Sequence, residues 1–181
     1  MNSCLLLIDI QEALRDKNSP FYIGDLNDFV SAVNKMIAWA REKKTPIVFS
    51  LHKFKPDGSD ILPQEKGNMD DFIEGNPRAE FIRDIDRKAG DIVFVKNRFS
   101  VFSNKNFDNF LKKNKIEELI VGGLITNCCV RATIIDAYNL GYKTTIVKEI
   151  CASDLKETDE FTFKDLESLL FGIKIVGLKD I

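Results

Sequence analysis

The stretch Glu118-Leu-Ile-Val-Gly-Gly-Leu-Ile-Thr-Asn-Cys-Cys-Val-Arg-Ala-Thr-Ile-Ile-Asp-Ala-Tyr-Asn-Leu-Gly141 combines a strand, a turn and a helix. Its first part, residues 118–124, is a nearly continuous apolar run of strand length, which is typical of a strand covered on both faces of a parallel sheet. Residues 128–140 carry a helical pattern, and Gly141 stands where a glycine commonly ends a helix. The stretch therefore predicts one strand–helix unit of an α/β protein.

The same alternation of strands and helices extends along the whole chain. Helices are predicted at 26–40 after a cap at Asp25, around 107–111, and near the C-terminus after a cap at Thr162. The predicted strands are residues 4–10, 46–51, 91–95, 118–124, 143–147 and 172–176. We therefore expect a single domain over residues 1–181, a Rossmann-like three-layer α/β/α sandwich with a mainly parallel six-stranded sheet.

Composition and charge narrow the class of protein. The chain has 181 residues, of which 44% are hydrophobic and 30% charged, with a formal net charge of -2. Such a small charge gives no reason to expect a nucleic-acid or membrane partner. The apolar N-terminal run is too short for a signal peptide, and no run approaches the roughly 20 residues of a spanning helix, so we expect a cytoplasmic protein with reduced cysteines. The four cysteines lack paired metal-ligand spacing and His52 is the only histidine, so neither a metal nor a cofactor is expected.

Three residues that carry chemistry follow predicted strands. Asp9 ends the first strand, Lys96 ends the third, and Cys129 follows the fourth. In an open α/β sheet, ligands bind outside the carboxyl ends of the strands, so we expect these side chains near one another. An ammonium and a helix N-terminus lower the pKa of a thiol, and a carboxylate can take its proton. Each residue alone has a structural explanation, but together they predict a nucleophilic site in which the helix start offers N–H groups to an oxyanion.

Residues 123–137, Gly-Leu-Ile-Thr-Asn-Cys-Cys-Val-Arg-Ala-Thr-Ile-Ile-Asp-Ala, resemble the nucleophile segment of the isochorismatase-like cysteine hydrolases. Leu-Leu-Ile-Asp-Ile-Gln at 6–11 is similar to the first strand of that family. Val-Lys-Asn-Arg-Phe-Ser-Val-Phe at 95–102 resembles its lysine segment, and Gly-Asn-Pro-Arg-Ala-Glu at 75–80 resembles a turn upstream. In the family the nucleophile directly precedes the valine of its segment, which here makes it Cys129, while Cys128 takes a usually apolar position and is expected to fill the core.

The resemblance implies a mechanism. Asp9 would act as general base, Lys96 would hold the negative charge in place, and Cys129 would attack a carbonyl to form a thioester that water hydrolyses. It also implies a cis peptide bond between Leu124 and Ile125, which would turn the Ile125 N–H toward the oxyanion beside the Cys129 N–H. The bond cleaved would be the C–N bond of a small amide, ureido or carbamoyl compound. A homodimer or homotetramer is the assembly expected.

Other functions stay open on the sequence. Members that hydrolyse nicotinamide carry a metal held by histidines after the second strand, a set that His52 alone does not supply. Isochorismate hydrolysis cleaves an ether, and members with that activity commonly lack the cysteine. A non-catalytic binding module is a further alternative, although no G-x-G-x-x-G or Walker pattern supports it. A disulfide between Cys128 and Cys129 would be strained.

The expected substrate pocket comes from loops and from segments beside the triad. Residues 52–76 form a long irregular connection that we expect to set specificity, and residues 152–161 to form a lid or a subunit contact. Arg98 is the candidate partner of a substrate carboxylate. The candidate pocket residues are Gln11, Leu14, Phe21, His52, Phe54, Phe72, Arg98 and Phe99.

Overall fold

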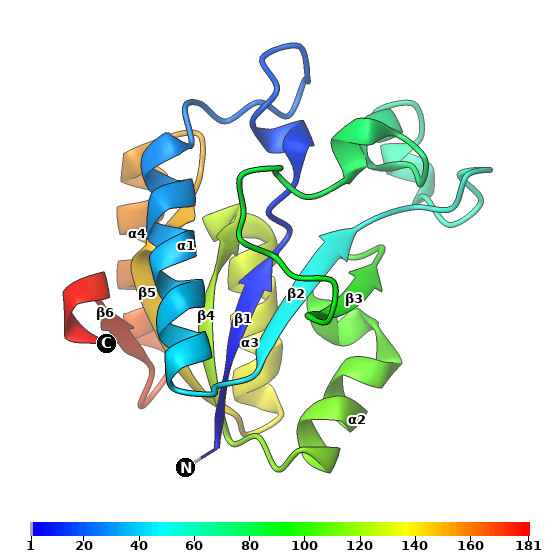
Figure 1. Cartoon of the computed structure of the whole chain (residues 1–181). Coiled ribbons are helices and arrows are strands. Elements are labelled where there is room, and N and C mark those ends of the chain that lie inside the picture. Colours follow the sequence, from blue (N-terminus) through cyan, green and yellow to red (C-terminus); the bar gives the residue numbers. More distant parts are fainter. Residues whose placement is uncertain (1) are drawn as a thin grey trace.

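One six-stranded sheet in the order β3-β2-β1-β4-β5-β6 forms the centre of the computed structural model, which describes residues 2–181 (Figure 1). The strands are β1 Ser3–Ile8, β2 Ile47–His52, β3 Ile92–Lys96, β4 Glu118–Leu124, β5 Lys143–Ala152 and β6 Lys174–Val176. All neighbouring strands pair in parallel. The predicted α/β class and the parallel six-stranded sheet are confirmed.

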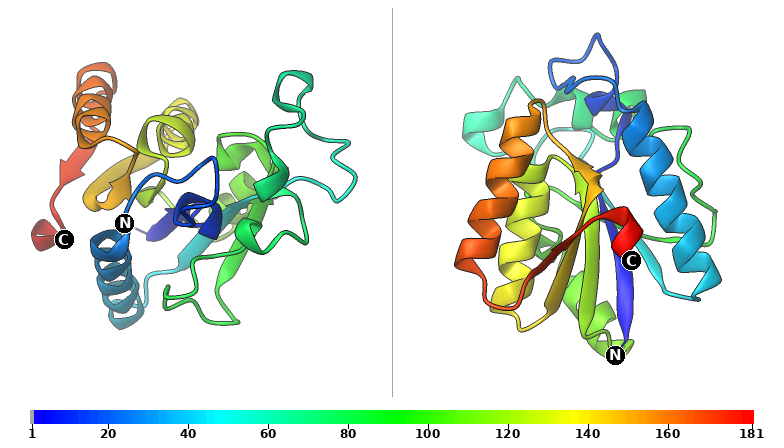
Figure 2. Two further views of the ribbon diagram at one scale, coloured as in Figure 1. Left: turned by 90° about the horizontal axis from the view of Figure 1, so that it is seen from above. Right: turned by 90° about the vertical axis from the view of Figure 1, so that its left-hand side faces the viewer.

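Helices cover both faces of this sheet. The α-helices are α1 Asn27–Glu42, α2 Lys105–Lys113, α3 Arg131–Asn139 and α4 Lys156–Leu169. Figure 2 shows α1 on one face and α3 and α4 on the other, with the sheet between them. None of the helices among residues 2–181 is long and apolar enough to cross a membrane.

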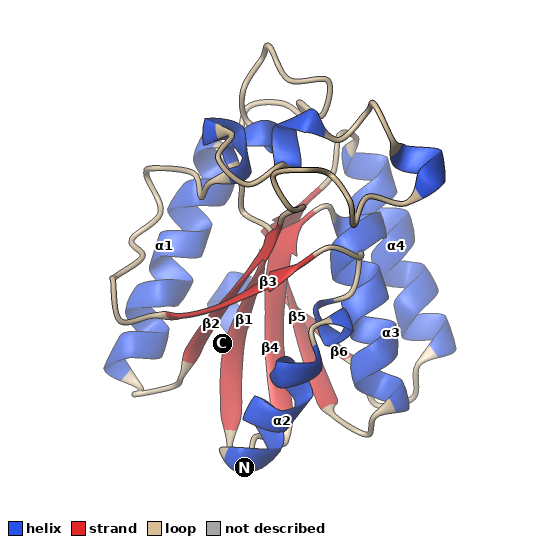
Figure 3. Ribbon diagram, turned by 90° about the vertical axis from the view of Figure 1, so that its right-hand side faces the viewer, coloured by secondary structure: helices blue, strands red, loops and turns tan. Residues whose placement is uncertain are grey.

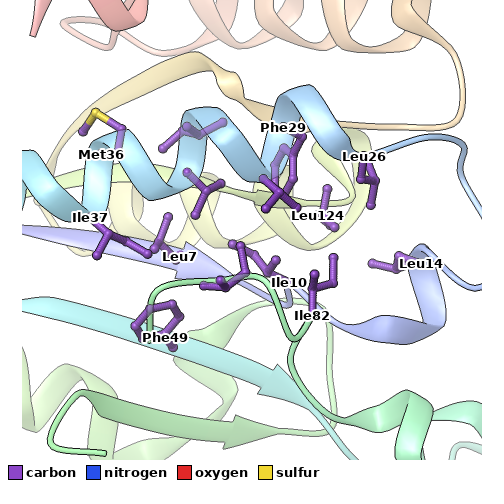
Figure 4. Packing of buried hydrophobic residues seen from close by; sticks show 14 of the residues in the cluster. Leu7, Ile10, Leu14, Leu26, Phe29, Met36, Ile37, Phe49, Ile82 and Leu124 are labelled. Carbon is purple, nitrogen blue, oxygen red and sulfur yellow. The ribbon is translucent and has the colours of Figure 1, made fainter. Parts of the chain in front are cut away.

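The two faces of β1 bury alternate residues in separate cores. Leu5 and Leu7 belong to the cluster that includes α1, and Leu6 and Ile8 belong to the cluster that includes α2, α3 and α4. This division follows from the two-residue repeat of a strand, whose successive side chains point to opposite faces. Figure 4 shows the first cluster, in which Ile37 of α1 lies next to Leu7 of β1. Since both faces are covered, the central strand β1 is apolar from Cys4 to Ile8, as the sequence indicated.

Two helix starts differ from the sequence prediction. Helix α4 begins at Lys156, so Thr162 lies inside the helix, where its hydroxyl donates to the Thr158 carbonyl at 2.7 Å. The predicted Thr162 cap is therefore wrong, because a buried threonine inside a helix can satisfy its hydroxyl on the preceding turn. At α1 the N-cap residue is Leu26, but the Asp25 carboxylate still accepts the Asn27 N–H at 2.9 Å.

Glycine is required where β4 passes close to β1. Gly123 has φ of +137°, and a Cβ added there would lie 2.2 Å from the Ile8 carbonyl oxygen. We predict that Gly123→Ala lowers the free energy of unfolding by about 2–3 kcal/mol through backbone strain and steric overlap. Gly141 has φ of +85° with no atom within 4 Å of such a Cβ. Gly141→Ala should cost only about 1–2 kcal/mol. Urea unfolding compares the two, and equal losses would contradict the importance of the β1 contact.

The carboxyl ends of the strands face a cover of loops. Figure 3 shows loops and short helical turns gathered above this end of the sheet. They come from the β1–α1 connection and from the long β2–β3 connection, and include the turns Glu12–Leu14, Asp70–Phe72 and Pro77–Ala79. The segment after β4 is also short and helical, Thr126–Val130. The end of the sheet at which ligands are expected is therefore the end over which these loops lie.

Candidate functional site

The structure brings Asp9, Lys96 and Cys129 together at the carboxyl ends of three strands. Asp9 follows β1 with φ of +49°, Lys96 is the last residue of β3, and Cys129 lies in the turn after β4. The Lys96 ammonium is 2.5 Å from Asp9 Oδ2 and 3.5 Å from Cys129 Sγ. The Asp9 and Lys96 side chains are almost completely buried. These are the three residues that the sequence placed at one edge of the sheet.

The two oxygens of Asp9 have different surroundings. Oδ1 accepts a hydrogen bond from the Ser50 hydroxyl at 2.8 Å. Oδ2 faces the Lys96 ammonium as an ion pair, but within the described chain it accepts no hydrogen bond of good geometry. Oδ2 is thus the oxygen that can accept a further proton. Ser50 was not singled out in the sequence, although a polar residue among the apolar residues 47–51 of strand β2 was a usable signal.

Lys96 is held as a cation by its neighbours. Its ammonium donates to the Arg98 carbonyl at 2.9 Å and lies 3.4 Å from His52 Nδ1. Burial by itself lowers the pKa of a lysine, but the charge of Asp9 is the largest opposing cause, and the pKa of Lys96 is raised. Lys96 therefore stays protonated and serves as a fixed positive charge between the carboxylate and the sulfur.

The pKa of Cys129 is raised, which is opposite to the direction expected from the sequence. The largest cause is a side-chain hydrogen bond with Cys128, followed by burial and by the charge of Asp9, and Lys96 opposes them. The same hydrogen bond lowers the pKa of Cys128. Cys129 is therefore a thiol at rest, and its attack on a carbonyl requires a base to take its proton.

Cys128 does not fill the core, so that expectation is wrong. Its side chain is half-buried and lines the same cavity as Cys129. The sequence argument assumed an ordinary α-helix, with about 100° between successive residues. The turn Thr126–Val130 is instead a π-helix, closed by the Val130 N–H on the Ile125 carbonyl at 3.3 Å. A wider turn changes the direction of each side chain, and π-turns are frequent at functional sites.

A cavity of about 90 Å³ opens beside Cys129. Its walls come from the β1–α1 loop, the end of β2, the β2–β3 connection, the loop after β3, the end of β4 and the turn after it. The lining residues are Asp9, Leu14, Phe21, His52, Met69, Phe72, Phe99, Leu124, Ile125, Cys128 and Cys129. Five of the pocket residues expected from the sequence line it, and Met69 joins them without having been anticipated. The peptide bond between Leu124 and Ile125 is cis.

Gln11 is one of three expected pocket residues that do not line this cavity. Its side-chain amide is completely buried and donates to the carbonyls of His52 at 3.0 Å and Ala79 at 2.7 Å. Its oxygen accepts the His52 N–H at 2.8 Å. These hydrogen bonds connect β2 to the β2–β3 connection and occupy the side-chain amide of Gln11. The amide is therefore not available to a substrate.

Arg98 and Phe54 also point elsewhere. The Arg98 guanidinium donates to the carbonyls of Asp60, at 3.1 Å, and of Asn97. The Phe54 ring is buried and packs edge-on against His52, with centroids 4.8 Å apart. Arg98 therefore supports the loop, and Phe54 supports the histidine that does reach the cavity.

An ion-pair cluster holds two walls of the cavity together. Arg78 pairs with Asp16 at 2.7 Å and with Asp71 at 3.1 Å. Asp16 lies two residues after Leu14, and Asp71 directly precedes Phe72. The turn resembling the family segment at 75–80 thus fixes the relative position of two cavity-lining side chains.

His52 is predicted to stay neutral well below its ordinary titration range. Burial, and next the charge of Lys96, lower its pKa from 6.5 to about 4. Because the unfolded chain binds this proton more readily, the free energy of unfolding should fall as the pH drops from about 6.5 toward 4. His52 is the only histidine, so a proton NMR titration of tag-free protein follows one ring. A midpoint near 6.5 would contradict this environment.

The residues present do not fit the histidine-based metal site carried by some cysteine hydrolases. Among residues 2–181 no group of three or more His, Cys, Asp or Glu side chains is arranged to hold a metal ion. His52 Nδ1 lies 3.4 Å from the Lys96 ammonium, which is a cationic neighbour.

Comparison with known proteins places the chain in a family. The family model described as the isochorismatase domain matches residues 3–175. The chain belongs to the isochorismatase family. The resemblance seen in the sequence is thereby confirmed.

Isochorismatase-family relatives are distant in sequence but cover most of the chain. Maleamate amidohydrolase of Pseudomonas putida is 26% identical over 91% of this chain and 78% of its own. Nicotinamidase of Escherichia coli is 25% identical over 97% of this chain and 95% of its own. The crystal structure of an isochorismatase family protein from Desulfovibrio vulgaris has a TM-score of 0.89 at 26% identity and covers 98% of this chain and 95% of that chain.

Proposed function

We propose that this isochorismatase-family protein is a cysteine hydrolase that cleaves a C–N bond, other than a peptide bond, in a small molecule. The observation that carries this proposal is the cluster of Asp9, Lys96 and Cys129 at the wall of a partly open cavity. A thiol, a carboxylate oxygen without a hydrogen bond and a fixed ammonium are the groups that acyl transfer through a thioester requires.

Acylation uses the groups in a definite order. Asp9 Oδ2 takes the proton of the Cys129 thiol as the sulfur attacks the substrate carbonyl carbon. The resulting oxyanion accepts hydrogen bonds from the N–H groups of Ile125 and Cys129, two residues that line the cavity. Asp9 then gives the proton to the leaving nitrogen, the C–N bond breaks, and a thioester remains on Cys129.

Deacylation repeats the proton transfers with water. Asp9 takes a proton from the water that attacks the thioester, and returns it to the sulfur as the C–S bond breaks. The products are a carboxylic acid and the free Cys129 thiol. Throughout the cycle Lys96 keeps a positive charge between Asp9 and the sulfur, which favours the thiolate during attack and departure.

The named relatives support the type of bond. Maleamate amidohydrolase, N-carbamoylsarcosine amidase and nicotinamidase are all named for the hydrolysis of a C–N bond. The retained cysteine favours the same bond type over the ether of isochorismate. The raised pKa of Cys129 is compatible, because the thiol proton is removed during attack by Asp9.

Two assays with a panel of small amides test the proposal. Ammonia release reports hydrolysis, and hydroxylamine, which attacks a thioester, should divert turnover to a hydroxamate. We expect both products from the same substrates. Ammonia release without hydroxamate would exclude the thioester, and neither product from any member of the panel would contradict the hydrolase.

We also propose that the protein works as a homodimer or homotetramer in the cytoplasm. The start of α4 exposes two large apolar side chains, Leu155 and Phe161, which would be shielded by a second copy. All four cysteines are free. Free thiols are typical of proteins in a reducing compartment such as the cytoplasm. Light scattering on the protein and on Phe161→Glu tests the assembly, since the variant should dissociate.

A further inference from the structure

The side chains that line the cavity indicate which substrates fit, whereas the catalytic groups indicate only which bond is cleaved. The following inference rests on the proposed function. Beyond Asp9, His52 and the two thiols, every side chain that lines the cavity is apolar. These side chains are Leu14, Phe21, Met69, Phe72, Phe99, Leu124 and Ile125. The part of the substrate beyond the reacting carbonyl therefore lies against hydrocarbon and aromatic surface.

No positive charge in the described part of the chain is available to a substrate carboxylate in this cavity. The Lys96 ammonium is already paired with Asp9 at 2.5 Å and bonded to the Arg98 carbonyl at 2.9 Å. The Arg98 guanidinium is bound to the carbonyls of Asp60 and Asn97. His52 is neutral above about pH 4. A carboxylate placed here would lose its hydration without gaining a partner, which is strongly unfavourable.

The size of the cavity limits the acyl group. Its volume is about 90 Å³, whereas a buried apolar cavity that accepts benzene has about 150 Å³. In proportion, this cavity holds about three to four carbon atoms. An aromatic ring exceeds this volume and would extend into the open mouth of the cavity unless the walls move. The ion pairs of Arg78 with Asp16 and Asp71, which connect two of the walls, oppose such movement.

We propose that the substrates are small uncharged aliphatic carboxamides, with an acyl chain of about three to four carbons filling the apolar cavity. Hydrolysis adds water across the C–N bond and gives ammonia and a carboxylic acid. At neutral pH that acid is an anion, so the product meets the same unfavourable surroundings that exclude anionic substrates. The cavity therefore favours both the binding of the neutral amide and the release of the charged product.

Matched pairs of amides test this proposal through kcat/KM for ammonia release. Butyramide has a methyl group where succinamate has a carboxylate. Crotonamide and fumaramate differ in the same way. We expect the neutral member of each pair to be favoured by at least about 100-fold, and butyramide to exceed benzamide and nicotinamide by at least about tenfold. Preference for succinamate, or for the aromatic amides, would overturn the substrate class but leave the hydrolase standing. If no amide reacts and no hydroxamate forms, the proposed function itself is contradicted.

Charge placed in the wall gives a second, independent test. Met69→Lys supplies the missing cation, and Met69→Gln is the uncharged control of similar length. Relative to the control, the lysine variant should raise the succinamate-to-butyramide ratio of kcat/KM at least tenfold. An unchanged ratio in folded protein would contradict the proposal. Arg98→Gln should leave the ratio unchanged, and a selective loss of succinamate turnover would show that Arg98 turns inward to bind carboxylates.

Discussion

Cys129→Ser is expected to lower kcat/KM for the amide that the enzyme hydrolyses by at least about 10⁴-fold. A serine hydroxyl is far harder to ionise than a thiol, and the site is built around sulfur, which lies 3.5 Å from the Lys96 ammonium. Asp9 can remove a proton from a thiol but is too weak a base for a hydroxyl without further help. Ammonia release under matched conditions, with hydroxamate trapping as the second readout, measures the loss.

Cys128→Ala is the matched control. Both cysteines line the cavity, but only Cys129 is bonded to Lys96. The control should retain kcat/KM within about tenfold. It should also become alkylated at Cys129 by iodoacetamide at a lower pH, because the hydrogen bond that the Cys129 thiol donates to Cys128 is the largest cause that raises the pKa of Cys129. Activity that survives Cys129→Ser and disappears in Cys128→Ala would reverse the assignment of the nucleophile.

Lys96→Met is expected to abolish turnover and to lower the free energy of unfolding at pH 7 by about 3–5 kcal/mol. The Lys96 and Asp9 side chains are almost fully buried and 2.5 Å apart. Removing the lysine leaves a buried carboxylate whose only hydrogen bond from residues 2–181 comes from Ser50. An unpaired charge in such a place costs more than the lost attraction alone. Urea unfolding monitored by circular dichroism gives the free energy.

A double-mutant cycle with Asp9→Asn separates charge from packing. In the Asp9→Asn/Lys96→Met variant neither charge is left unpaired, so its loss of stability should be clearly smaller than the sum of the single losses. All three variants should be inactive, since each lacks part of the proton-transfer machinery. Additive losses would show that the two side chains do not interact, and a single-variant loss below about 1 kcal/mol would show that the pair is solvated.

The predictable part of the site follows from backbone geometry. Asp9, Lys96 and Cys129 each follow an apolar run, and parallel strands place such positions at one end of the sheet. The long β2–β3 connection was expected to shape the pocket, and Met69 and Phe72 of that segment do line it. Met69 was not named in advance, because a methionine in an irregular loop has no periodicity from which its direction can be inferred.

The sequence by itself determined the α/β sheet, because apolar runs show which strands are covered on both faces. It also determined the family and the positions of Asp9, Lys96 and Cys129 at the ends of strands, because local motifs show where each strand ends. Only the tertiary structure decided that Cys128 faces the cavity, that Arg98 turns toward Asp60, and that the pKa of Cys129 is raised. These features depend on a π-turn and on contacts between segments far apart in the chain. Electrostatics and cavity shape act through space, and residue order along the chain carries no direct record of them.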